Sequence, residues 1–243
     1  NQLIEFISSS PVRNQLSLLF TEILVEDLTK FQTQKHAMNS IHGVVHEHLY
    51  ISTMALIIFN LSNLDATQLH DNLFNCINAW INYISISRQV SPQGRMDLSE
   101  LLESLLKVML QSNENEQYGS AEKVISIFSH IFSNDPLLMN FELRSRLETI
   151  FLGVSHGDTN ADKSQYQWML AYMNYLVTNE MYSELKDLSI CVCDFLQINT
   201  LDLCNKLFTT IQTQDQAASD NTQEYIKVLL QLTNFPLHPV SQE

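Results

Sequence analysis

The stretch from Ala66 to Ser87, ATQLHDNLFNCINAWINYISIS, decides the fold of this chain. Its apolar residues recur every three or four positions, which is the period of one face of an α-helix, and its polar residues follow the same period on another face. The stretch therefore predicts an amphipathic helix that packs with one side and meets water with the other. The apolar side comprises Leu69, Leu73, Cys76, Ile77, Trp80, Ile81 and Ile84.

The same periodicity continues along nearly the whole chain, interrupted by short polar clusters at helix-length spacing. Only 5 Gly and 5 Pro occur in 243 residues, where average usage would give about 17 and 12. An all-β fold needs such turn residues at short intervals, so we expect an all-α protein. The predicted helices span residues 2–8, 12–33, 37–61, 66–87, 98–111, 118–133, 138–154, 161–178, 182–210 and 220–234, the longest broken near Asn199.

Starts of alternate helices recur at similar distances. Leu98 and Leu138 lie 40 residues apart, and Ala66 and Tyr118 lie 52 apart. These distances bracket the roughly 40 to 47 residues of a HEAT or armadillo unit, in which two antiparallel helices stack on the next pair. We expect residues 1–243 to form a single α-solenoid segment of about four to five HEAT-like repeats, a superhelix of antiparallel helix pairs. Because the chain begins without an initiator Met or a signal sequence, we interpret it as a fragment of a larger protein.

The charge balance indicates the chemistry of the partners. The chain has 27 acidic and 13 basic side chains, and its net charge is -14. That charge disfavours direct binding to nucleic acid or to anionic membranes and favours a protein with a basic surface. The longest uninterrupted apolar run, Met54 to Phe59, is far too short for a membrane span. The four cysteines lie in apolar helical stretches, which indicates a reducing compartment and thiols that pack like small hydrophobes.

Stripes of short polar or acidic side chains run along three predicted helices. Each of these helices would be the second of its pair, and stacked second helices line the concave side of a solenoid. A solvated helix face is the simpler explanation for any single stripe, because half of every amphipathic helix is polar. Our candidate partner-binding residues are Asp71, Asn75, Asn78 and Asn82 on the first stripe, Glu122, Ser126 and Ser129 on the second, and Glu184, Asp187 and Asp194 on the third.

No catalytic, cofactor-binding or metal-binding motif occurs in the sequence. His42 and His46 lie at i and i+4, but the cluster that they form with His48 lacks both the HExxH spacing and a further ligand nearby. Cys191 and Cys193 lie two positions apart on a predicted helix, so they point away from each other and core packing explains them. We therefore predict that the chain is not an enzyme and binds no cofactor.

Three segments resemble the karyopherin-β, or importin-β and exportin, superfamily. Residues Leu73 to Tyr83, LFNCINAWINY, resemble the second helix that marks the transportin-SR and importin-thirteen branch, with a Cys and a Trp in this register. The stretch Leu229 to Val240, LLQLTNFPLHPV, is similar to that branch's helix ending before a short "PV" segment. Leu3 to Ile7, LIEFI, is similar to an "LLEFL" stretch of these receptors. The three segments occur in the family's order.

The resemblance implies a nuclear transport receptor. Such receptors carry protein cargo through nuclear pores on the concave surface of a HEAT-repeat superhelix, contact nucleoporins, and shuttle between nucleus and cytoplasm under the control of Ran-GTP. Their main Ran site would lie N-terminal to Asn1. The alternatives are a HEAT-repeat scaffold or regulatory subunit unrelated to nuclear transport and, more distantly, a metal-dependent helical hydrolase.

Overall fold

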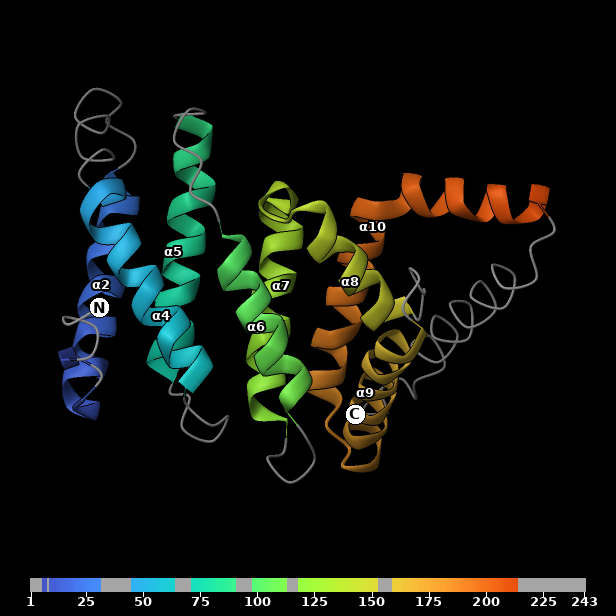
Figure 1. Ribbon diagram of the computed structural model, residues 1–243, viewed down its shortest axis with the longest axis horizontal. Coiled ribbons are helices and arrows are strands. Elements are labelled where there is room, and N and C mark those ends of the chain that lie inside the picture. The colour runs from blue at the N-terminus through green and yellow to red at the C-terminus, as the bar shows by residue number, and fades with distance from the viewer. Residues whose placement is uncertain are drawn as a thin grey trace, which may run out of the picture. The chain divides into compact units, whose positions relative to one another are not determined.

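The computed structural model describes residues 6–7, 9–31, 45–63, 71–90, 98–112, 118–152 and 159–213. This part of the chain is helical and contains no strand, which confirms the all-α prediction for it. The chain divides into two compact units, Asn1–Asn140 and Phe141–Glu243. The elements, shown in Figure 1, are α2 (Pro11–Phe31), the π-helix η1 (Val45–Tyr50), α4 (Ile51–Asn63), α5 (Asp71–Val90), α6 (Ser99–Gln111), α7 (Gly119–Asn134), the 3₁₀ turn η4 (Pro136–Leu138), α8 (Phe141–Leu152), α9 (Thr159–Thr178) and α10 (Tyr182–Thr213).

Most helix boundaries lie close to their predicted positions, and two differ for identifiable reasons. The helix predicted from residue 138 begins only at Phe141, because Pro136 opens a 3₁₀ turn and Met139 then takes an extended conformation. The helix predicted over 37–61 has a π-helical turn at Val45–Tyr50 before α4. The helix predicted over 220–234 lies outside the described residues, as does most of the one over 2–8.

The break predicted near Asn199 is a bend within a continuous helix. The helix α10 runs unbroken from Tyr182 to Thr213, and Figure 1 shows it changing direction along its length. The buried Asn199 amide donates a hydrogen bond to the Phe195 carbonyl oxygen at 2.8 Å, and the Thr200 hydroxyl donates one to the Leu196 carbonyl oxygen at 2.9 Å. Side-chain bonds of this kind to a carbonyl four residues earlier are a recognised cause of helix bending.

The described helices of the first unit, α2, α4, α5, α6 and α7, pack in two rows. In one row α5 lies between α2 and α7, and in the other α4 lies beside α6, while α6 also packs against α7. The apolar residues predicted for α5 are buried here from Leu73 to Ile84, and Leu69 lies outside the described residues. Trp80 has no exposed surface and contacts the rings of Tyr50 and Tyr83, with centroids 5.7 and 5.8 Å away in edge-to-face geometry. Edge-to-face pairs of this kind stabilise a core beyond the burial of their area.

Within residues 141–243, α9 packs against both α8 and α10. The rings of Phe151 and Phe195 meet edge to face with centroids 5.5 Å apart, and both side chains are fully buried. None of the described helices in either unit combines the length and apolar character that crossing a bilayer requires.

Candidate functional site

The stripe predicted on α5 faces solvent. Asp71, Asn75 and Asn82 are exposed, and Asn78 is half-buried. The helix places them there because they step by four, three and four positions, while Cys76, Ile77 and Trp80 are fully buried. The division of α5 into a packed side and a wet side is therefore confirmed.

The stripe predicted on α7 has the same character. Glu122 and Ser126 are exposed and Ser129 is half-buried, whereas Val124, Ile127 and Phe128 are buried. Short hydroxyl side chains leave the helix backbone close to the surface. A partner could therefore approach this helix closely and bond to the hydroxyl groups.

The two stripes meet, because α7 packs beside α5. The ammonium group of Lys123 on α7 forms an ion pair with the carboxylate of Asp71 on α5. The same nitrogen lies 5.4 Å from the centroid of the Phe74 ring. We call the joint surface made by Asp71, Asn75, Asn78, Asn82, Glu122, Ser126 and Ser129 the α5–α7 face.

A second contact joins the helices farther along. His130 Nε2 on α7 lies 2.6 Å from Asn82 Oδ1 on α5, and His130 Nδ1 lies 3.1 Å from the side-chain amide nitrogen of Asn134. Because an amide nitrogen can only donate and an amide oxygen can only accept, the ring carries its proton on Nε2 and is neutral. Burial lowers the pKa of His130, which favours the same neutral form.

The third predicted stripe belongs to α10 and hence to the other unit, so it is described separately from the α5–α7 face. Asp187 is exposed, and Glu184 and Asp194 are half-buried. Cys191 interrupts this stripe and is fully buried, and burial raises the pKa of its thiol. Cys193, which we expected to pack in the core, is exposed. It was misassigned because apolar residues dominate its surroundings in the sequence, although its position falls on the outer side of α10.

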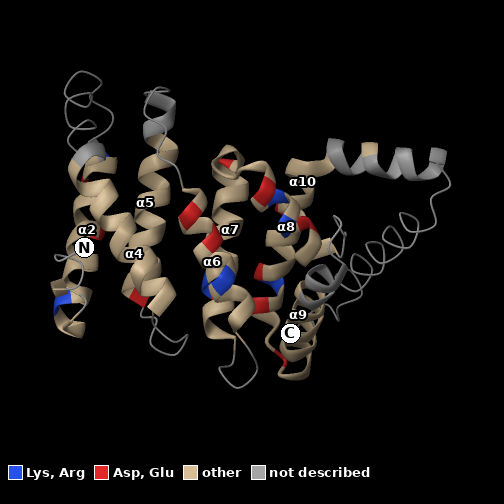
Figure 2. Cartoon of the chain, viewed as in Figure 1, with Lys and Arg blue, Asp and Glu red and all other residues tan. Residues whose placement is uncertain are grey.

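The α5–α7 face is mainly an uncharged hydrogen-bonding surface. Its amides and hydroxyls both donate and accept, and the negative charge of Asp71 is balanced locally by Lys123. The helix α4 contains no Asp, Glu, Lys or Arg and α5 contains only two, so charged side chains are sparse along both in Figure 2. The face can thus recognise peptide groups and polar side chains, with Glu122 as the acid that could contribute charge.

Of the three histidines considered as metal ligands, only His48 has a described side chain. No three His, Cys, Asp or Glu side chains there lie close enough to hold a metal ion. His42 and the side chain of His46 are outside the described residues, and His48 is exposed.

Sequence reasoning missed Lys123 and His130, the two side chains that tie α7 to α5. Each is 48 or more positions from its partner, as the contacts of Lys123 with Asp71 and of His130 with Asn82 show. Identifying these pairs requires knowledge of which helices lie side by side. A basic residue next to the stripe, such as Lys123 after Glu122, was the one available signal.

The segment Leu73 to Tyr83, which resembles the karyopherin-β helix, lies in α5. Its Cys76 and Trp80 are fully buried, and the Cys76 thiol lies 3.4 Å from the Thr21 hydroxyl on α2. These two residues therefore serve packing, whereas Asn75 and Asn82 of the same segment are exposed and contribute to the accessible surface. Comparison of the chain with protein-family models and with curated proteins gave no match.

Proposed function

We propose that this chain is a segment of a nuclear transport receptor of the karyopherin-β superfamily and that it binds protein cargo on the α5–α7 face. The observation that carries the proposal is the pairing of two rows of short polar side chains on adjacent helices. Asp71 with Lys123, and Asn82 with His130, hold these rows side by side. A partner-binding surface needs such a preorganised array more than it needs any single residue.

The packing of residues 1–140 supports a HEAT-repeat solenoid as the architecture. One row contains α2, α5 and α7, the other contains α4 and α6, and α6 packs against α7 across the rows. Antiparallel helix pairs stacked in register produce this pattern, in which each pair buries its apolar surface on its neighbours. In such a stack the α5–α7 face belongs to the row of second helices, which lines the concave surface.

Recognition on this face combines hydrogen bonds with a modest electrostatic attraction. Asn75, Asn78 and Ser126 offer donors and acceptors to a partner's backbone, and Glu122 attracts a basic surface. The net charge of -14 adds a long-range field that speeds encounter with a basic protein and weakens as salt increases. We therefore expect cargo with a basic surface to be preferred.

Ran-GTP controls loading and release in the proposed mechanism, with its main site N-terminal to this segment, and nucleoporins carry the complex through the pore. The receptor shuttles between nucleus and cytoplasm. A solenoid suits such control, because small shifts between neighbouring repeats can couple the binding of one ligand to that of another.

A pull-down with the full-length protein tests the proposal. Ran locked in its GTP form should be retained and Ran loaded with GDP should not. Retention of neither form would exclude a Ran-regulated receptor and favour the alternative, a helical scaffold or regulatory subunit outside nuclear transport. The variants Trp80→Ala and Asn78→Ala serve as controls, because the first disturbs the core and the second alters only the α5–α7 face.

A further inference from the structure

The ammonium group of Lys123 occupies a position with two separate attractions for a cation. It forms an ion pair with the carboxylate of Asp71, and it lies over the ring of Phe74, 5.4 Å from the centroid. A carboxylate supplies a full negative charge, and the face of an aromatic ring supplies a partial one. Together they make a site that suits a positively charged side chain, and the protein fills this site with its own lysine.

The site is built by the first turns of α5. Asp71 is the first residue of this helix, and Phe74 and Asn75 follow at i+3 and i+4, so the three residues are neighbours on one side. The Asp71 side chain is 76% exposed and Asn75 is exposed, whereas Phe74 is 3% exposed beneath Lys123. A ligand from solution therefore reaches the carboxylate and the amide directly, and it reaches the ring once Lys123 moves aside.

Lys123 is held weakly enough to be displaced. Its side chain is 38% exposed, and an ion pair between partly exposed groups contributes little stability, because water screens both charges. The lysine stem is long and flexible, so the ammonium group can leave the site without a change in the backbone of α7. The contact is therefore an intramolecular competitor for any ligand of the same charge.

Arginine fits this position better than lysine does. Its planar guanidinium has five N–H donors and stacks on aromatic rings, so it can bond to the Asp71 carboxylate and the Asn75 side-chain oxygen while lying on Phe74. An ammonium group is compact and acts as a point charge. The protein already contains a contact of the arginine kind, because the Arg13 guanidinium lies over the Phe6 ring, 4.1 Å from the centroid.

We propose that the side chains of Asp71, Phe74 and Asn75 form a binding site for an arginine of a partner protein. Lys123 occupies this site until the arginine displaces it, so a partner is retained only if its guanidinium makes stronger contacts than the internal ammonium group does. This inference rests on the proposed function, because it names the chemical group of a basic cargo that one end of the α5–α7 face holds.

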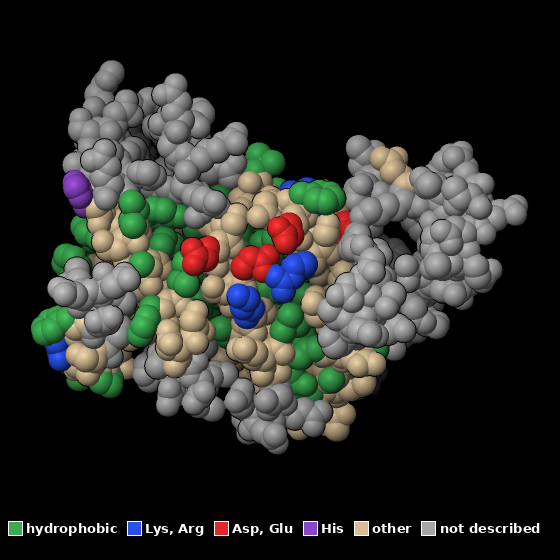
Figure 3. All heavy atoms as spheres, viewed as in Figure 1, with side chains coloured by type: hydrophobic (Ala, Val, Ile, Leu, Met, Phe, Trp, Pro, Cys, Tyr) green, Lys and Arg blue, Asp and Glu red, His purple; other side chains and the backbone are tan. Residues whose placement is uncertain are grey.

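Exposed acids elsewhere provide the background against which the site is measured. Figure 3 shows acidic side chains beside basic ones at the surface over α6, and Glu100 on this helix is exposed. Acids of this kind attract any basic peptide through a screened field and do not distinguish a guanidinium from an ammonium group. A preference for arginine therefore separates the proposed site from general attraction.

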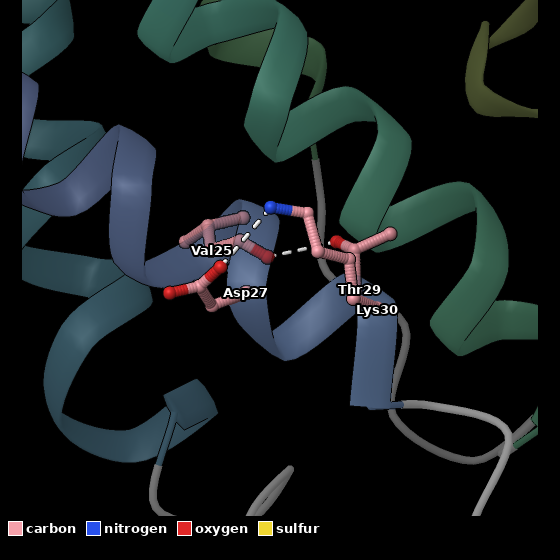
Figure 4. A network of polar contacts seen from close by, with 4 residues as sticks. All are labelled: Val25, Asp27, Thr29 and Lys30. Carbon is pink, nitrogen blue, oxygen red and sulfur yellow. Dashed lines mark hydrogen bonds and ion pairs between the residues drawn. The ribbon is translucent and has the colours of Figure 1, made fainter.

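A second ion pair of the same unit provides a comparison. Figure 4 shows Lys30 Nζ on α2, 3.1 Å from Asp27 Oδ1, and neither of the other two residues drawn there is aromatic. The side chains of this pair are 69% and 55% exposed. Removing Lys30 frees a carboxylate of the same charge as Asp71 without the Phe74 ring, so Lys30→Ala is the matched control for Lys123→Ala.

Peptide binding to the full-length protein tests the proposal. The probes are a fluorescent peptide of alternating glycine and arginine and its lysine counterpart of equal length. Lys123→Ala should lower the Kd of the arginine peptide about tenfold and that of the lysine peptide about threefold or less, since the freed site favours a guanidinium. Lys30→Ala removes the same charge and should lower either Kd by less than about twofold.

Two further variants locate the gain. In the Lys123→Ala background, Asp71→Asn removes the charge of the carboxylate, and Phe74→Leu removes the aromatic face while keeping an apolar side chain. Each should cancel most of the gain for the arginine peptide. Because the Asp71 side chain is largely exposed, Asp71→Asn leaves the fold intact and keeps the test decisive even where Phe74→Leu disturbs the core.

An unchanged Kd for the arginine peptide in Lys123→Ala would overturn the proposal, because Lys123 would then block no site. An equal gain in Lys30→Ala, or a gain that survives Asp71→Asn, would overturn it too, since general charge would then explain the binding. An equal gain for the lysine peptide would exclude a site that favours a guanidinium. None of these measurements involves Ran, so failure of this proposal and failure of the proposed function are distinguishable.

Discussion

Asn82 on α5 and His130 on α7 are joined by a hydrogen bond of 2.6 Å between Oδ1 and Nε2, 48 residues apart in the sequence. This bond requires a proton on Nε2, and the separate contact in which Nδ1 accepts from the Asn134 amide requires a neutral ring. If Nδ1 were protonated, its N–H group would face the N–H group of the Asn134 side-chain amide, and two donors cannot bond to each other. The Nε2 atom would still donate to Asn82, so protonation acts on the contact with Asn134 within α7.

Stability should fall in mild acid partly because of His130. Burial lowers the pKa of this imidazole in the folded protein, so the unfolded chain binds a proton first as the pH decreases. The stability that the neutral imidazole of His130 contributes is fully present above the unfolded pKa of about 6.5, and it is lost as the pH falls towards the folded pKa. His130→Gln keeps a polar side chain and removes the titration. The advantage of the native protein over this variant in urea unfolding should shrink from about pH 7.5 to about pH 5; a constant difference would refute this.

Truncation of the aromatic core should destabilise the fold. Trp80 and Phe128 have no exposed surface, so Trp80→Ala or Phe128→Ala should each reduce the free energy of unfolding by about 3 to 5 kcal/mol. The exposed Ser126→Ala should change it by less than about 0.5 kcal/mol. Chemical denaturation measures all three, and a loss at Trp80 no larger than at Ser126 would contradict the described packing.

Charge reversal on the α5–α7 face should weaken binding of a basic cargo. We expect Asp71→Lys combined with Glu122→Lys to raise Kd about tenfold at low salt and less at high salt, since these exposed charges act through a screened field. Unchanged affinity for every cargo tested would count against this face.

A charge swap separates the local pair from the overall field. Exchanging the ion pair, as Asp71→Lys with Lys123→Asp, preserves the combined charge of these two positions. This double variant should bind basic cargo more strongly than Asp71→Lys alone. Identical binding by both variants would mean that the charge of this face has no role in recognition.

The cysteines should differ sharply in reactivity. Burial raises the pKa of the Cys76 thiol to about 11 and also raises that of Cys191, whereas Cys193 is exposed. In a Cys204→Ser background, a thiol reagent at about pH 8 should modify Cys193 alone until the protein unfolds, because the thiolate is the reactive form. Adding Cys193→Ser should abolish the native-state reaction, and rapid modification of Cys76 in the folded protein would contradict its burial.

Local periodicity predicted the helices and the two sides of α5 and α7, because both depend on residues within a few turns of each other. Pairing across helices was not predictable in this way: Lys123 meets Asp71 only because α7 stacks beside α5. The exposure of apolar side chains on α2, such as Leu16 and Phe20, was not predicted for a different reason. A helical period identifies which residues share a side, and it does not distinguish a side that is buried from one that is open, as Leu16 and Leu18 illustrate.

The decisive measurement for the proposed function is the affinity of the full-length protein for a basic cargo, determined by titration with and without Ran-GTP. We predict that Ran-GTP changes the cargo Kd by about tenfold or more and that Ran-GDP leaves it unchanged. Whether Ran-GTP raises or lowers this Kd distinguishes import from export. The charge-reversed variant at Asp71 and Glu122 should bind the same cargo more weakly in both conditions. A cargo Kd that is the same with Ran-GTP, with Ran-GDP and without Ran would contradict the account.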